Sequence, residues 1–388
     1  MKLLHFFGIL AKKNISKNTK NLEAAVNRRT IHVADMTNSI ITKTGSYIPP
    51  DRVPNSHFLE NVFYDANGQL LDRPNSQVIQ KLHEITGIEE RRYAPKEVCA
   101  SDMAFVAAEA ALDGVDRESI DYIIVAHNFG DVKPDSLRLD TVPTLAARVK
   151  HRLRIKNPYT VAFDLPFGCP GWLQGVILAD YVIKSGDAKK VLVIGAETLA
   201  RVADPHDMDC MIYSDGAGAT LLEATSADAG ILSHVVRSDT FDHAFLLRMR
   251  ASYDPRQDRS KLYIKMNGHD IYRYAVKTVP LVVKQNLEKS GLGLGDIKRI
   301  LIHQANEKMD AAIIKRLFDL FKVKEIPADI MPMIISWTGN SSVATLPTML
   351  DLIMKGKMDD HCLEPGDLVV FASVGAGMNI NSMIYKMP

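Results

Sequence analysis

The chain has 388 residues, of which 46% are hydrophobic and 24% charged, and its formal net charge is +1. These proportions are typical of a globular protein. A nearly neutral chain lacks the positive surface that nucleic-acid-binding proteins use, so we expect no nucleic-acid partner. No apolar run approaches the roughly 20 residues that a membrane-spanning helix needs, so we expect no membrane insertion.

The four cysteines show no metal-binding or disulfide pattern. Cys99, Cys169, Cys210 and Cys362 have no CxxC spacing and no paired histidines at ligand spacing. We therefore expect no metal site, no disulfide scaffold and a reducing compartment, the cytoplasm. Residues 1–36 begin with a short apolar run, but lysines follow at once and a small-residue cleavage site is missing, so we expect an N-terminal extension rather than a signal peptide.

Strands and helices alternate along the first part of the chain. Hydrophobic patterns predict strands and helices in the following order: strand 39–44, helix 102–112, strand 120–126, helix 141–152, strand 160–163, helix 171–184, and strands 191–196 and 217–222. Continuous apolar strands separated by helices predict an α/β fold with a mostly parallel sheet covered on both faces.

A weak internal repeat relates the two halves of the chain. The run Ile120–Val125 matches Ile297–Ile302, and Val191–Thr198 matches the strand-like run Leu368–Gly377. Two pairs in the same order predict a duplicated core, with one half at 37–222 and the other at 223–388. The polar stretch at about 223–270 is interpreted as loops and a short cap.

Cys169 lies where a strand passes through a tight turn into a helix. The β-branched and aromatic run Thr160–Phe163 predicts a buried strand, and Gly168 permits a sharp turn. Pro170 suits the first position of the helix expected at 171–184. Cys169 would therefore lie at a helix N-terminus, where the partial positive charge lowers a thiol pKa and favours the nucleophilic thiolate.

Three polar features of the second half complement this cysteine. His303 ends a buried strand, Asn340 follows Gly339 just before a helix, and the segment 373–379 is a glycine turn between two strands. Each feature alone is commonly structural. Together they predict a cysteine that attacks an acyl thioester, a histidine and an asparagine that stabilise an enolate, and backbone N–H groups that form an oxyanion hole.

This set resembles the condensing enzymes of the thiolase superfamily, especially β-ketoacyl-acyl-carrier-protein synthase III. The resemblance spans residues 37–388 and rests on five motifs in register: TGIEERR at 86–92, VLVIGAETLAR at 191–201, SDGAGATLL at 214–222, HQAN at 303–306 and GNSSVATLPT at 339–348. It implies a duplicated βαβαβαββ core in five layers, α-β-α-β-α, a homodimer, and no cofactor.

The resemblance also implies roles for individual residues. Cys169 matches the nucleophile that accepts the acyl group, and His303 and Asn340 match the pair that binds the extender and promotes its decarboxylation. Gly375 or Gly377 matches the glycine whose N–H joins that of Cys169 in the oxyanion hole. The implied reaction is a Claisen condensation of an acyl thioester with a malonyl thioester, as in fatty acid biosynthesis.

The chain departs from the family in its predicted substrate contacts. The stretch Gln80–Ile88 lacks the tryptophan and arginine that clamp coenzyme A in the family, so the carrier is left open as acyl carrier protein, coenzyme A or both. Phe167 and Trp172 flank the nucleophile and are expected to shape the acyl pocket. A basic docking face for an acidic carrier is predicted at Arg273, Lys277, Lys308, Lys315 and Arg316, with Lys308 as a substrate-binding residue.

Three other functions remain open from the sequence. A non-decarboxylating condensation of two acyl thioesters would need a base, for which Glu197 and Asp131 are weak candidates. A thioester hydrolase would let water attack the acyl-enzyme. A non-catalytic partner subunit is disfavoured because such partners lose the cysteine.

Overall fold

The computed structural model describes residues 37–134, 138–358 and 360–388. The predicted extension at 1–36 lies outside the described residues. Residues 38–388 form one compact unit. The boundary between two halves at residue 222 stays a prediction. The strands before and after this residue form two sheets with the same order, as described next.

The first sheet has five strands in the order β1-β9-β8-β4-β7. Four of them run in one direction, and only β9 is antiparallel to its neighbours β1 and β8. The mostly parallel sheet is confirmed. Its strands are β1 (Asn38–Tyr47), β4 (Tyr122–His127), β7 (Val161–Pro166), β8 (Lys190–Thr198) and β9 (Asp215–Thr225).

The second sheet repeats this order with one strand fewer. Its order is β10-β15-β14-β13, and β15 is antiparallel to both neighbours, as β9 is in the first sheet. The second sheet has no counterpart of β7 among its described strands. At that place, beside β13, the N–H of Ile300 donates to the carbonyl of Ile330 at 2.7 Å, but the segment around Ile330 does not form a strand. The strands are β10 (Gly230–Ser238), β13 (Ile297–Ile302), β14 (Leu368–Gly375) and β15 (Asn379–Lys386).

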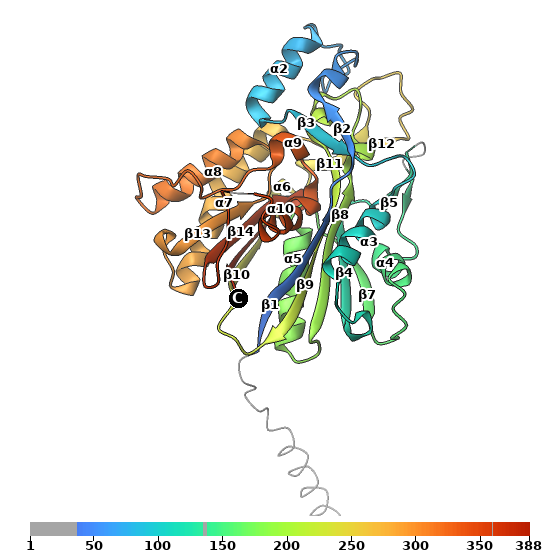
Figure 1. Ribbon diagram of the computed structural model, residues 1–388. Coiled ribbons are helices and arrows are strands. Elements are labelled where there is room, and N and C mark those ends of the chain that lie inside the picture. The colour runs from blue at the N-terminus through green and yellow to red at the C-terminus, as the bar shows by residue number, and fades with distance from the viewer. Residues whose placement is uncertain (1–36, 135–137, 359) are drawn as a thin grey trace, which may run out of the picture. The chain divides into compact units, whose positions relative to one another are not determined.

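Six helices complete the layers. On the outer face of the first sheet lie α3 (Ala100–Ala111) and α4 (Leu145–Arg152), and on that of the second lie α7 (Gly268–Ser290) and α8 (Glu307–Leu320). Between the sheets, α5 (Gly171–Lys184) and α10 (Thr345–Met354) share one core with both (Figure 1). The predicted five-layer α-β-α-β-α fold is confirmed.

The central helix α5 is buried because a sheet covers it on each side. Trp172, Leu173, Val176 and Ile177 are each at most 1% exposed. Burying a large apolar side chain of this kind contributes about 1.5–3 kcal/mol. The helix is therefore anchored along its length, and its N-terminus is held in a fixed place relative to both sheets.

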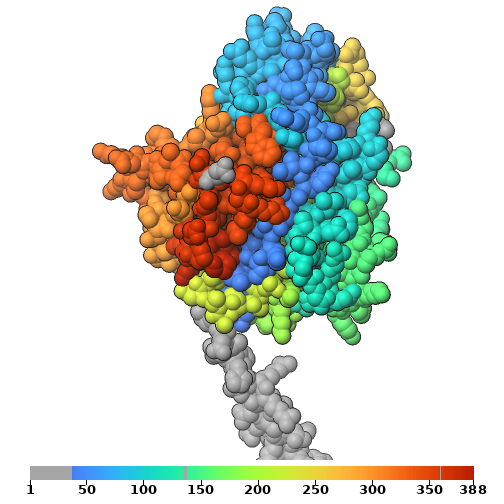
Figure 2. All heavy atoms as spheres, viewed as in Figure 1, coloured from blue at the N-terminus to red at the C-terminus, as the bar shows by residue number. Residues whose placement is uncertain are grey.

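The remaining elements form a cap and short connections. In the view of Figure 2, the N-terminal segment of the described chain (blue) lies on the surface between the C-terminal half (orange and red) and the remainder of the N-terminal half (teal and green). These elements are β2 (Asp51–Pro54), β3 (Glu90–Tyr93), α2 (Asn75–Thr86), β5 (Asp131–Val132), β6 (Leu139–Asp140), α6 (Thr240–His243), β11 (Leu247–Ala251), β12 (Leu262–Met266), α9 (Ile335–Thr338) and the 3-10 helices at 55–58, 117–119, 199–202, 208–212, 294–296, 342–344 and 376–378.

Two sequence interpretations need correction. The stretch 223–270 contains β10, a strand of the second core sheet, and the hairpin β11–β12, whereas we expected loops and a cap. The strand β7 forms where predicted but is not fully buried in the single chain, because it lies at the edge of its sheet and Val161 is 46% exposed.

Candidate active site

Cys169 lies at the turn between β7 and α5, as predicted. Gly168 adopts a φ of +76°, a left-handed conformation that glycine tolerates, and turns the chain after the strand. Its carbonyl accepts the N–H of Gly171 at 2.9 Å, and the carbonyl of Pro170 accepts that of Gln174 at the same distance. The nucleophile candidate is therefore held next to the first turn of the central helix.

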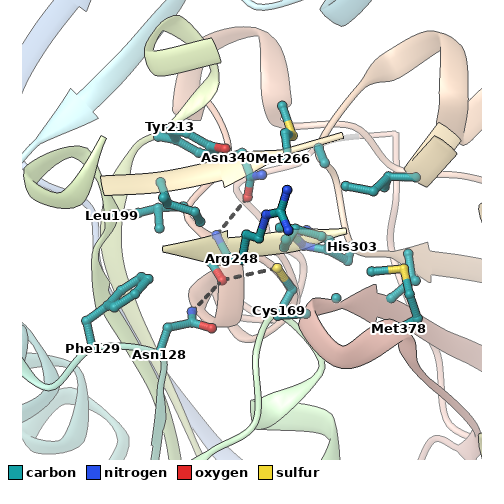
Figure 3. Close-up of a pocket in the computed structure, with 18 of the residues that line it drawn as sticks. Asn128, Phe129, Cys169, Leu199, Tyr213, Arg248, Met266, His303, Asn340 and Met378 are labelled. Atoms are coloured by element: carbon teal, nitrogen blue, oxygen red, sulfur yellow. Dashed lines mark hydrogen bonds between the residues drawn. The ribbon is translucent and has the colours of Figure 1, made fainter. Parts of the chain in front are cut away.

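One cavity of about 270 Å³ brings the predicted reagents together. Cys169, His303, Asn340 and Gly375 all line it, although they come from both halves of the chain (Figure 3). Most of the remaining wall is apolar and includes Phe129, Leu199, Met249, Ile264, Met266, Met309, Val374 and Met378. A nucleophile and two hydrogen-bonding groups thus share an apolar enclosure.

His303 follows β13 directly and is held by its backbone. Its N–H donates to the carbonyl of Ala372 at 2.9 Å, and the residue is only 3% exposed. Burial lowers the pKa of His303 to about 4, so its imidazole is neutral at physiological pH. A neutral imidazole can donate one hydrogen bond to a carbonyl oxygen in the cavity.

Asn340 is fixed through both its backbone and its side chain. Its N–H donates to the carbonyl of Ile212 at 3.0 Å, and its carbonyl accepts from Ser214 at 2.9 Å. Its Oδ1 accepts the N–H of Ser342 at 2.8 Å. The Nδ2 group is the end of this amide that remains to donate into the cavity.

The end of β14 approaches the nucleophile closely because Gly375 lacks a side chain. A Cβ at Gly375 would lie 2.7 Å from the backbone nitrogen of Cys169 and 3.0 Å from its Cβ. Gly377 does not line this cavity, and its φ of +76° shapes the turn into β15. Of the two predicted oxyanion-hole glycines, Gly375 is therefore the one in contact with Cys169.

Comparisons with known proteins match this arrangement over most of the chain. The family described as 3-Oxoacyl-[acyl-carrier-protein (ACP)] synthase III matches residues 163–240, and its C-terminal domain matches residues 287–387. Beta-ketoacyl-[acyl-carrier-protein] synthase III of Cereibacter sphaeroides is 32% identical over 356 residues, covering 90% of this chain and 98% of that protein. The chain belongs to the 3-oxoacyl-acyl-carrier-protein synthase III family.

Other relatives agree with that assignment. A synthase III of Halalkalibacterium halodurans is 33% identical and covers 90% of this chain and 99% of its own length. The crystal structure of 3-oxoacyl-[acyl-carrier-protein] synthase III from Aquifex aeolicus superposes with a TM-score of 0.73 at 28% identity, covering 90% of this chain and 99% of that one. As a member of the synthase III family, the chain is a condensing acyltransferase.

Three predicted substrate contacts lie elsewhere than the cavity. Trp172 faces the core between the sheets, where its indole N–H donates to Thr220 at 3.2 Å, and it does not line the cavity, so its role in the acyl pocket stays a prediction. Phe167 is half-buried and does not line the cavity either. Lys308 is exposed on α8 and does not line the cavity. From this position it could contact a docked carrier protein.

The thiol of Cys169 is less acidic than its place at a helix N-terminus suggested. Burial raises the pKa of Cys169 to about 11, the hydrogen bond from Ser342 lowers it, and the nearby Glu197 carboxylate raises it. The expected lowering is therefore wrong for the free protein. The helix is present as predicted, but enclosure among apolar side chains outweighs its effect on the thiolate.

A pH profile of alkylation measures this raised thiol pKa. The rate at which iodoacetamide modifies Cys169 should rise about tenfold per pH unit between pH 7 and 10, because only the thiolate reacts. Peptide mapping by mass spectrometry separates Cys169 from the other cysteines. A plateau of the Cys169 rate below pH 8 would show that the thiol is already ionised there.

The cavity wall also contains residues that the sequence did not reveal. Met249, Ile264 and Met266 come from the hairpin β11–β12, which was interpreted as part of a loop region. Lys265 fastens this hairpin, because its buried ammonium group contacts Asp204 at 2.5 Å and Asp207 at 2.9 Å. The alternating run LYIKM was the signal for a strand here.

The two weak candidates for a base have other partners. The carboxylate of Asp131 accepts from Ser101 and Arg148, each at 2.6 Å. Glu197 is fully buried and accepts two hydrogen bonds from Asn128. Neither residue lines the cavity, so neither is placed to remove a proton from a substrate there.

The described residues offer no arrangement for a metal ion or a membrane span. In residues 37–134, 138–358 and 360–388 no group of three or more histidine, cysteine and carboxylate side chains is placed to hold a metal. Within the same ranges every helix is too short or too polar to cross a membrane.

Proposed function

We propose that this chain joins an acyl thioester to a malonyl thioester through an acyl-Cys169 intermediate. The sulfur attacks the acyl carbonyl and the carrier thiol leaves. The malonyl thioester loses carbon dioxide, and the resulting enolate attacks the acyl-enzyme, which releases a β-ketoacyl thioester and the Cys169 thiol. The observation that carries this proposal is the meeting of Cys169, His303 and Asn340 in one apolar cavity.

In this proposal His303 and Asn340 hold the extender. A neutral imidazole and the Nδ2 group of the asparagine are both donors, and two donors on one thioester oxygen stabilise an enolate as its charge develops. The N–H of Cys169 and a backbone N–H of the adjoining glycine turn, which begins at Gly375, stabilise the oxyanion that forms on the acyl carbonyl.

The apolar lining of the cavity supports a hydrocarbon acyl chain as the donor. Methionine contributes four of the lining side chains, and its flexible thioether adapts to chains of different shape. Such a reaction lengthens an acyl chain by two carbons, which is the chemistry of fatty acid biosynthesis. We place the enzyme in the cytoplasm, a location supported by the reduced thiols of Cys99, Cys169 and Cys210.

Product analysis tests the proposed reaction against its alternatives. Purified protein is incubated with an acyl thioester and a malonyl thioester whose free carboxylate carries ¹⁴C. The proposal predicts a β-ketoacyl thioester and one equivalent of labelled carbon dioxide. A β-keto product made from two acyl thioesters without malonate would indicate the non-decarboxylating reaction. A free acid as the main product would indicate a hydrolase.

We further propose that an acidic acyl carrier protein docks on α7 and α8. Arg273, Lys277, Lys308, Lys315 and Arg316 are all exposed on these two helices, which pack against each other. Arg273 and Lys315 have acidic neighbours on their own helices, Asp270 at 3.8 Å and Asp319 at 3.0 Å. Exposed pairs of this kind are weak, so these cations remain able to contact a partner.

Charge reversal at Lys308 and Lys315 should raise the KM for acyl-carrier-protein substrates several-fold. Short thioester analogues should react unchanged, and added salt should shrink the difference because it screens exposed charges. Lys189→Glu is the matched control, since Lys189 is exposed just before β8 begins, at the opposite end of the sheet from the cavity. Equal effects on both substrate types would contradict docking at this face.

We also propose a homodimer built on the free edge of β7. Tyr159 at 85% and Val161 at 46% are exposed at the start of this strand, and Val142 at 84% and Leu139 at 54% are exposed in the segment before α4, the helix that packs on β7. An open strand edge with apolar side chains is a poor surface to leave in water. A second copy of β7 would pair with it and cover these residues.

Sedimentation equilibrium at micromolar concentration is expected to give the mass of two chains. Val142→Asp combined with Tyr159→Asp should weaken the dimer, because both side chains would be buried in it. Phe241→Asp is the control, since Phe241 is fully exposed on α6 and far from β7 in the sequence. A wild-type monomer under these conditions would contradict the dimer.

A further inference from the structure

A continuous chain of hydrogen bonds leads from a buried carboxylate to the sulfur of Cys169. The Oε2 atom of Glu197 accepts from the backbone N–H of Asn128 at 2.7 Å and from its Nδ2 at 2.6 Å. The same Nδ2 donates to the hydroxyl of Ser342 at 3.0 Å. The Ser342 hydroxyl then donates to the sulfur of Cys169 at 3.2 Å (Figure 3).

The hydrogen bonds in this chain run in one direction, toward the sulfur. The Nδ2 group of Asn128 has two hydrogens, and Glu197 and Ser342 accept one each. The Ser342 oxygen accepts from Asn128, and its own hydrogen is donated to the sulfur. Glu197 accepts from both the backbone N–H and the Nδ2 group of Asn128, and these two bonds orient the side chain so that Nδ2 faces Ser342.

The backbone of Ser342 is held in a conformation that serine rarely adopts. Its φ is +54°, in the left-handed region. Non-glycine residues in this region are strained and persist where the surrounding structure enforces them, often at functional sites. The N–H of Ser342 donates to Oδ1 of Asn340 at 2.8 Å, so one residue contacts both the nucleophile and the asparagine assigned to the extender.

We propose that the Ser342 hydroxyl is a further catalytic group that stabilises the negative charge on the Cys169 sulfur, and that Asn128 and Glu197 position it. The inference rests on the proposed function, because it assigns these residues to the acylation half of that reaction. A hydrogen bond to an ionised acceptor is markedly stronger than one to a neutral acceptor. The bond from Ser342 therefore strengthens as the sulfur gains negative charge.

Among the described residues, Ser342 provides the side-chain hydrogen bond to the sulfur. The titratable and charged side chains near Cys169 are Glu197 on β8, His303 after β13, Tyr213, and Arg248 of β11, which is exposed and lines the same cavity. Burial raises the pKa of Glu197 to about 7, so this group is a carboxylate above that pH, and a carboxylate beside a thiolate is repulsive. The hydrogen bond from Ser342 is the largest of the effects that lower the pKa of Cys169. The remaining wall is mostly apolar, so loss of the hydroxyl would leave the half-buried thiolate with fewer polar partners.

The test removes the hydroxyl in two ways and reads out the thiol itself. Ser342→Gly suits the left-handed backbone and keeps the N–H that binds Asn340, and Ser342→Ala keeps a side chain. In both variants the iodoacetamide rate at Cys169 should fall about tenfold at every pH between 7 and 9, the size expected for a lost hydrogen bond to a charge.

A matched control and a double variant separate this role from a structural one. Ser341→Ala removes the neighbouring hydroxyl, which lies 3.4 Å from that of Thr345, and should leave the Cys169 rate unchanged. Asn128→Ala should slow alkylation less than Ser342→Gly does, and should add nothing in the Ser342→Gly background.

Wild-type alkylation rates in both Ser342 variants would overturn the proposal, as would additive effects of Asn128→Ala and Ser342→Gly. Alkylation requires no substrate, so these outcomes are distinguishable from failure of the proposed function, which would appear as a wild-type protein that forms no β-keto product.

Discussion

Replacing Cys169 by alanine is expected to abolish the covalent acyl-enzyme and to lower the condensation rate by about 10⁴-fold or more, the scale seen when a catalytic nucleophile is removed. Cys169 is the cysteine that lines the cavity with His303, Asn340 and Gly375, and its sulfur accepts the Ser342 hydroxyl. Intact-protein mass spectrometry after incubation with acyl thioesters measures the acyl group gained by each protein.

Cys99→Ser is the control for this experiment. Cys99 caps the N-terminus of α3 and lies outside the cavity, and serine is a good residue for such a cap. The Cys99→Ser protein should gain the same acyl mass as wild type. An acyl group retained by Cys169→Ala, or condensation at a measurable fraction of the wild-type rate, would place the nucleophile elsewhere.

The second large effect separates the two half-reactions. His303→Ala and Asn340→Ala should each slow the release of carbon dioxide from the malonyl thioester by about 10²–10³-fold, the usual cost of losing one donor to a developing oxyanion. Both variants should still transfer an acyl group to Cys169, because neither side chain donates a hydrogen bond to its sulfur. Radiolabel retained on the protein and labelled carbon dioxide released are the two measurements.

His127→Asn is the matched control for His303. His127 ends β4 as His303 follows β13, the equivalent strand of the second sheet, but its ring contacts Gly130 at 2.9 Å and Asp164 at 3.1 Å instead of lining the cavity. This variant should decarboxylate at the wild-type rate. If Asn340→Ala decarboxylated at the wild-type rate, Asn340 would have only a structural role in its turn. If His303→Ala lost acyl transfer, the assignment of His303 to the decarboxylation half-reaction would be wrong.

The parts of the fold with strong local signals were predictable from sequence. The helix α5 spans Gly171–Lys184, the predicted range, because Pro170 sets its start and apolar residues continue through it. The equivalent strands β4 and β13, and β8 and β14, form the repeat that the sequence suggested. A core strand that is buried on both faces has a long apolar run, which can be recognised in the sequence even when its partner strands are unknown.

The missed elements have mixed polarity because they face two environments. The strand β10 forms an edge of the second sheet, and His234, Arg237 and Ser238 interrupt its apolar positions. In the hairpin β11–β12 the apolar side chains that line the cavity alternate with charged ones, which include Arg248 at the cavity wall and Lys265 with its two aspartates. Such segments resemble loops until their tertiary partners are known.

The candidate site shows the same division between local and distant causes. Cys169, His303 and Asn340 were found because each stands at a junction of recognisable motifs. Sequence does not say which side of α5 faces the cavity, and Trp172 lies on the side that faces the core between the sheets. The pKa of Cys169 depends on enclosure by both halves, and the hydrogen bond between Asn128 and Ser342 joins residues 214 positions apart, so neither had a local signal.

A pulse-chase experiment shows whether an acyl group on Cys169 is the intermediate of a decarboxylative condensation. Protein loaded with a ¹⁴C-labelled acyl group is freed of excess donor and mixed with unlabelled malonyl thioester. We expect label to leave the peptide containing Cys169 and to appear in the β-ketoacyl thioester, with one carbon dioxide released per acyl group. Label that stays on the protein, or leaves it as free acid at the same rate with and without malonyl thioester, would rule out acyl-Cys169 as the intermediate.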